Sequence, residues 1–84
     1  MAKLTELEQY VIDRAKFRRM ELGISQKELS HLLNASEGWV GLVESTNTDD
    51  KYSLRRVNDL ALVLKCSPRY FLPEEPFKDE KVIA

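Results

Sequence analysis

The chain has 84 residues, the size of one small domain with a single hydrophobic core. Hydrophobic residues make up 43% of it, which suits a compact domain, and the three Gly and three Pro argue against a low-complexity chain. The 13 basic and 14 acidic side chains leave a net charge of −1, so the total charge excludes a strong general attraction to nucleic acid.

The first predicted helix begins after Thr5, which forms a capping-box pattern with Glu8. Gly23 stands at the position where glycine ends many helices. We expect the apolar face of this helix to be formed by Leu7, Val11, Ala15 and Leu22.

A second capping box, Ser25 with Glu28, predicts a short helix that ends near Leu33. Asn34 tolerates the left-handed backbone of a tight helix exit. Ser36 is then expected to cap a third helix that extends to residue 44, with a buried side formed by Val40 and Val43.

After the polar loop 45–52, a fourth helix is predicted from Ser53 or Leu54. Its expected apolar face contains Leu54, Val57, Leu60, Ala61 and Leu64. Ser67-Pro68 predicts a fifth helix of one turn, whose residues Tyr70, Phe71 and Leu72 would close the core. The prediction is therefore a compact all-α fold with five helices, followed by a polar, mobile tail over residues 73–84.

The tail contains four of the acidic and two of the basic residues, so its removal leaves 11 basic and 10 acidic side chains. That balance is still close to neutral. Any contact with DNA must therefore come from a local basic surface and from helix N-termini.

Two short helices joined by the turn Asn34-Ala35-Ser36 match a helix-turn-helix unit over about residues 25–44. The segments "RRMELGISQKELSHLLNASEGWVGLVE" and "SLRRVNDLALVLKCSPRYFL" together resemble the XRE-type (Cro and phage-repressor-like) helix-turn-helix family. The resemblance implies a DNA-binding domain over residues 1–72, which inserts helix 37–44 into the major groove.

The resemblance also implies residue roles. Gln26 would contact a DNA phosphate and brace the recognition helix, with Ser25 and Lys27 beside it. Arg19 and Glu44 would form a partly buried ion pair that holds the first helix against the third.

By the same resemblance, the residues expected to face the bases are Ser36, Glu37, Gly38, Gly41 and Leu42, with Trp39 to one side. The usual base readers Arg, Gln and Asn are missing from this set, although Glu37 could accept from a cytosine amino group. Leu42 could touch a thymine methyl group. Three interpretations of Trp39 stay open: a core residue, a DNA contact or a protein contact.

Lys51 and Arg55 are further candidates for phosphate contacts, although Asp49 and Asp50 share the loop of Lys51. His31 lacks the partners that catalysis or metal binding would need, and the single Cys66 fits a small buried hydrophobic residue. We expect neither an enzyme nor a cofactor nor a metal site. No apolar run reaches the ~20 residues that span a membrane, and no signal peptide is recognisable, which predicts a cytoplasmic protein.

These observations lead to the hypothesis of a sequence-specific transcriptional regulator of prokaryotic, phage or mobile-element type. It would bind double-stranded DNA as a homodimer. The alternative is a protein-interaction module, antitoxin-like or regulatory, that uses the same scaffold without strong base readout.

Overall fold

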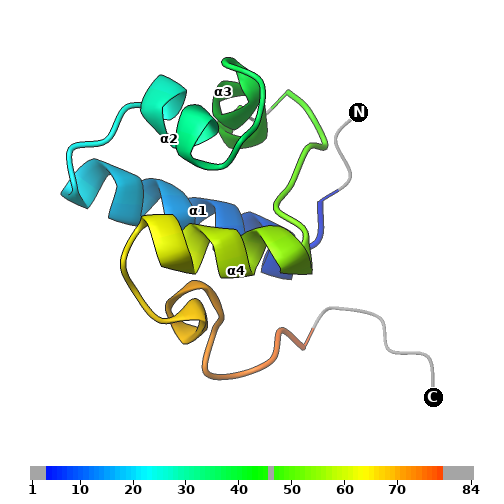
Figure 1. Ribbon diagram of the computed structural model, residues 1–84. Helices are drawn as coiled ribbons and strands as arrows, with labels where there is room; N and C mark the ends of the chain where they lie inside the picture. Colours follow the sequence, from blue (N-terminus) through cyan, green and yellow to red (C-terminus); the bar gives the residue numbers. More distant parts are fainter. Residues whose placement is uncertain (1–3, 46, 79–84) are drawn as a thin grey trace.

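The fold is known from a computed structural model that describes residues 4–45 and 47–78. It contains the α-helices α1 (Glu6–Glu21), α2 (Gln26–Leu32), α3 (Trp39–Glu44) and α4 (Leu54–Val63), and the 3₁₀ helix η1 (Pro68–Phe71), as Figure 1 shows. The all-α class is confirmed, since the described residues form no strand.

The expected count of five helices is wrong: the described residues form four α-helices, and the predicted one-turn helix is a short 3₁₀ element. Ser67 caps it by accepting the N–H of Arg69, and the carbonyl of Ser67 accepts the N–H of Tyr70 at 2.9 Å. Leu72 then has extended backbone angles (φ −113°, ψ 146°), so the helix cannot continue.

Helices α2 and α3 pack against each other, and η1 contacts both α1 and α4 (Figure 1). Arg18 joins α1 to the end of α4, since its Nε donates to the carbonyl of Leu64 at 3.0 Å and its Nη2 to that of Lys65 at 3.2 Å. Helices α1 and α4 and η1 therefore form one packed unit, and the α2–α3 pair lies against it.

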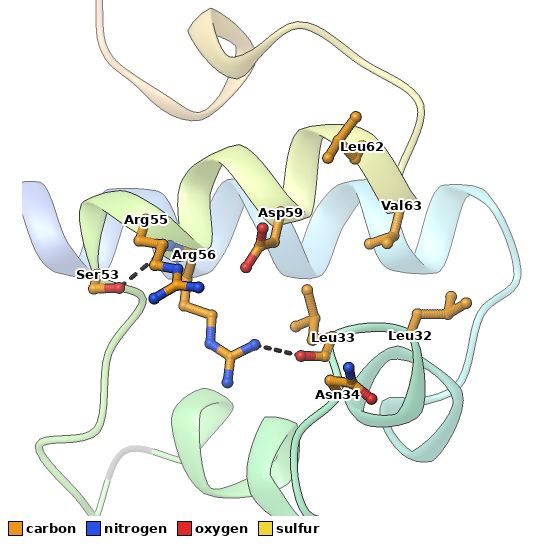
Figure 2. Close-up of a pocket in the computed structure, with 9 residues that line it drawn as sticks. All are labelled: Leu32, Leu33, Asn34, Ser53, Arg55, Arg56, Asp59, Leu62 and Val63. Atoms are coloured by element: carbon orange, nitrogen blue, oxygen red, sulfur yellow. Dashed lines mark hydrogen bonds between the residues drawn. The ribbon is translucent and has the colours of Figure 1, made fainter.

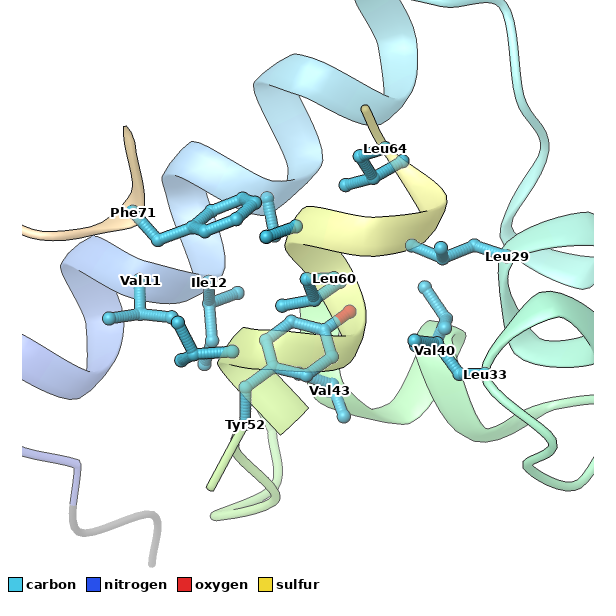
Figure 3. Packing of buried hydrophobic residues seen from close by; sticks show 13 residues of the cluster. Val11, Ile12, Leu29, Leu33, Val40, Val43, Tyr52, Leu60, Leu64 and Phe71 are labelled. Carbon is cyan, nitrogen blue, oxygen red and sulfur yellow. The ribbon is translucent and has the colours of Figure 1, made fainter. Parts of the chain in front are cut away.

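Side chains from every element meet in one core, shown in Figure 3. Its most completely buried members are Ile12, Ala15, Leu29, Val40, Val43, Leu60, Leu64 and Phe71. The buried face of α1 differs from the predicted one: it contains Val11, Ile12, Ala15 and Arg19. Leu7 and Leu22 lie at the two ends of α1, and each is 39% exposed.

Two other predicted core residues are also exposed. Leu54 is the first residue of α4 and is 82% exposed, whereas Val57, one turn later, is buried. Leu72, 41% exposed, follows the end of η1, whereas Phe71 fills the core and Tyr70 is partly buried.

The helix boundaries follow the sequence signals except at α3. Both capping boxes are present, and Gly23 (φ 71°) and Asn34 (φ 60°) have the left-handed conformation expected of them. The predicted cap at Ser36 is wrong: its carbonyl accepts the N–H of Trp39, and α3 begins only after Gly38. Since glycine has low helix propensity, residues 37–38 form a turn and α3 is two residues shorter than predicted.

The predicted tail is only partly described. In the described portion, the ring of Phe77 packs edge-on against Tyr10 of α1, with ring centres 5.9 Å apart. Residues 79–84 lie outside the described residues, so the mobility of that segment stays a prediction.

Candidate nucleic-acid interface

A buried carboxylate ties the three N-terminal helices together. Glu44, at the end of α3, accepts from Arg19 of α1 through two parallel hydrogen bonds, Nε to Oε2 at 2.9 Å and Nη2 to Oε1 at 3.0 Å. The side chains are 3% and 10% exposed, respectively. Gln26 of α2 donates its amide to the same Oε1 at 2.9 Å. This network fixes the orientation of the α2–α3 pair on α1.

The position of the Gln26 side chain gives a structural reason for Gly41, one of the two glycines in the predicted recognition helix 37–44. A Cβ placed on Gly41 would lie 3.3 Å from the Gln26 Oε1, a tight contact that would require the Gln26 side chain to shift slightly. Glycine at this position therefore lets the Gln26 side chain pass over α3 on its way to Glu44. Gly38 has no neighbour within 4 Å of such a Cβ and precedes α3 in an open turn.

Ser30 joins α2 to the start of α3, a role that the sequence did not reveal beyond the small size of the residue. It is fully buried, donates its hydroxyl to the carbonyl of Gln26 at 3.0 Å and accepts the N–H of Val40 at 3.1 Å. Because Gly38 offers no side-chain cap, Ser30 satisfies an N–H at the beginning of α3 from the neighbouring helix.

Trp39 is half-buried and packs its ring within the domain. The ring meets Tyr52 edge-on at 5.5 Å, and the guanidinium of Arg56 lies 4.9 Å from the ring centre. Arg56 also donates to the carbonyl of Leu33. Of the three interpretations of Trp39, this geometry matches a partly buried core residue. Arg56 and Tyr52 had no recognisable signal in the sequence, because both contacts are tertiary.

The remaining predicted groove residues are exposed: Ser36, Glu37, Gly38 and Leu42. Glu37 is the one charged side chain among them. Its Oε1 lies 3.8 Å from Lys27 Nζ and 4.0 Å from His31 Nε2, and all three side chains are more than half exposed. Such exposed pairs contribute little to stability, so Glu37 and Lys27 can exchange these contacts for others.

The predicted phosphate contacts do not all lie together. Ser25, Gln26 and Lys27 are exposed beside α3, whereas Lys51 lies 3.1 Å from the Glu8 carboxylate. The backbone N–H of Thr5, and secondarily Lys51, lower the pKa of Glu8 below its usual value. Arg55 is exposed at the start of α4 and lines a groove between α2 and α4 (Figure 2).

The pKa values of two other side chains, Tyr52 and Cys66, are raised. Burial raises the pKa of Tyr52, and the nearby charge of Glu44 adds to the effect. The Tyr52 hydroxyl has no hydrogen-bond partner in the described part of the chain. Cys66 is partly buried, and this burial raises the pKa of its thiol.

Among residues 4–45 and 47–78, no three His, Cys, Asp or Glu side chains are grouped so that they could hold a metal ion. None of the described helices is long and apolar enough to cross a membrane. Comparisons with protein-family models, curated proteins and solved structures found no match.

Proposed function

We propose that this protein is a DNA-binding transcriptional regulator of prokaryotic, phage or mobile-element type, similar to the XRE helix-turn-helix family. Residues 37–44 would enter the major groove, and two copies would bind two half-sites whose centres are about 34 Å apart.

The observation that carries the proposal is the way in which α2 and α3 are held. Glu44 and Arg19 hold the pair onto α1 through a largely buried ion pair at one end of α3, and Gln26 adds an exposed hydrogen bond to Glu44. At the opposite end, residues 36–38, which lead into α3, are exposed, as is Leu42 within the helix. A recognition element needs this combination, since a rigidly held helix presents its free surface in one orientation.

Sequence preference would rest on few direct contacts. Glu37 is suited to a cytosine amino group and Leu42 to a thymine methyl group. Lys27 and Gln26 on α2 would bind phosphates beside them, with Arg55 as a further contact. Three or four phosphate contacts per protomer give a dimer a salt slope of about −5 to −7.

The test is selection of bound duplexes from a random DNA library by the purified protein, repeated with Glu37→Ala and Lys27→Ala. We expect an enriched motif that loses its preference at one position with Glu37→Ala. Lys27→Ala should keep the motif, weaken binding and reduce the salt slope by about 1 per protomer. A lack of enrichment at low salt, with properly folded protein, would refute the proposal.

A second candidate is a protein-interaction module. Its support is that residues 36–44 contain no Arg, Lys, Asn or Gln, while Leu42 is 49% exposed. A protein contact through Leu42 should change little as salt rises, whereas phosphate binding weakens steeply. Leu42→Ser would therefore abolish a salt-independent interaction but leave the salt slope of DNA binding unchanged.

A further inference from the structure

A groove runs between the C-terminal end of α2 and α4 (Figure 2). Its volume is about 580 Å³. The side chains that line it, shown in Figure 2, are Leu32, Leu33, Asn34, Ser53, Arg55, Arg56, Asp59, Leu62 and Val63.

The two ends of the groove differ in chemistry. Arg55 and Arg56 stand at one end, and Leu32, Leu62 and Val63 at the other (Figure 2). Leu62 is 71% exposed and Leu32 is 52% exposed, so the apolar end is open to solvent. The two leucines therefore offer exposed apolar surface inside a concave site.

At the basic end, the Arg55 side chain is available to bind a ligand. Arg56 already binds the Leu33 carbonyl and stacks on Trp39. The structure shows no ion pair for Arg55 within the described residues, although Asp59 lines the same groove. With two arginines and one aspartate, the groove carries a net positive charge at the end opposite the leucines.

We propose that this groove binds a short acidic and aliphatic peptide segment of a partner protein. A carboxylate of the segment pairs with Arg55, and its aliphatic side chains cover Leu32, Leu62 and Val63. Charge complementarity selects the acidic residue, while the apolar end gives a phosphate chain nothing to bind and so favours a peptide over nucleic acid.

The groove also connects such a partner to DNA binding, a consequence that rests on the proposed function. Arg55 is expected to contact a DNA phosphate, and one guanidinium cannot pair fully with a phosphate and a carboxylate together. The peptide segment should therefore weaken DNA binding.

The test uses the whole protein, fluorescently labelled, and an immobilised pool of hexapeptides that contain two glutamates and two leucines in every order. Two control pools carry glutamine for glutamate or serine for leucine. We expect binding to a subset of the first pool and to neither control. Arg55→Gln and Leu62→Ser should each lower the affinity for the best-binding peptide about tenfold. The first removes the partner of the peptide carboxylate, and the second removes an apolar contact.

Matched controls lie outside the groove. Leu54→Ser replaces another exposed leucine of α4, and Arg69→Gln another exposed arginine, so neither should change peptide affinity. Equal losses from Leu54→Ser and Leu62→Ser would overturn the proposal, as would an absence of binding to the first pool.

Two further results would assign the groove to another occupant and so overturn the proposal. One is self-association of the protein in sedimentation equilibrium that Leu62→Ser abolishes. The other is binding of duplex DNA that depends on Leu62 as strongly as on Arg55. If the peptide binds and DNA does not, the groove assignment holds and the proposed function fails; if DNA binds and the pool does not, the reverse applies.

Discussion

Replacement of Glu44 by alanine tests the buried network that holds α3. The carboxylate receives three hydrogen bonds, two from Arg19 and one from Gln26, and it is almost fully buried. In Glu44→Ala the Arg19 guanidinium keeps one hydrogen bond, from its Nη1 to the Ile24 carbonyl at 2.7 Å, but loses its counter-charge.

The loss should be large because a charge is left buried without its partner. Breaking one side of a buried ion pair costs about 3–5 kcal/mol. Small domains have free energies of unfolding of about 5–15 kcal/mol, so this change removes a substantial part of the total. For a domain of this size, we expect the melting temperature to fall by at least about 12 °C.

Urea unfolding followed by circular dichroism measures the effect. Glu21→Ala is the matched control, since it breaks the more exposed Arg18–Glu21 pair on the surface of α1 and should cost less than about 1 kcal/mol. The double variant Glu44→Met with Arg19→Met should be more stable than Glu44→Ala, because no unpaired charge remains. A loss below about 1 kcal/mol in Glu44→Ala would refute this account of the network.

The other predictions concern three single positions: Tyr52, Lys65 and Cys66. Tyr52→Phe removes a buried hydroxyl without a partner and should raise the free energy of unfolding by about 1 kcal/mol in urea titrations. Because the folded protein raises the pKa of Tyr52 above its unfolded value of about 10, stability should fall as pH rises above about 10, and Tyr52→Phe should lessen that fall. Lys65 has φ 56°, so Lys65→Gly should stabilise the protein by about 0.5–1 kcal/mol, whereas Lys65→Ala should give no gain. The raised pKa of Cys66 should make iodoacetamide alkylation at pH 8 slower than that of a free thiol, with the normal rate restored in denaturant; an equal rate in the folded protein would contradict the effect of burial.

The local features of the fold could be predicted because the signals that set them are local. Thr5 and Ser25 form their capping boxes with residues three positions away, and Asn34 sets the exit of α2 through its own backbone. Which side of α1 is buried could not be predicted in the same way. Apolar periodicity favoured Leu22, whereas the buried position belongs to Arg19. Only the resemblance to the helix-turn-helix family predicted its pairing with Glu44, which is 25 residues away.

The candidate site was harder to predict because most of its geometry comes from tertiary contacts. At Gly41, the one glycine within α3, a Cβ would crowd the Gln26 side chain, and only the folded structure brings these two residues together. Trp39 is likewise placed by Tyr52 and Arg56, from the following loop and from α4. No spacing rule within the sequence links these residues.

These contacts reduce the surface of α3 and of the turn before it that is free to contact a partner. Gly41 lies against the Gln26 side chain and Trp39 packs within the domain, so the free surface is reduced to residues 36–38 and Leu42. A surface with one carboxylate and one leucine can make few base contacts, each giving ~1–3 kcal/mol of discrimination at best. If the protein reads DNA, most of its affinity must therefore come from phosphate contacts. Its selectivity would then depend on DNA shape and on the spacing between two protomers more than on base contacts.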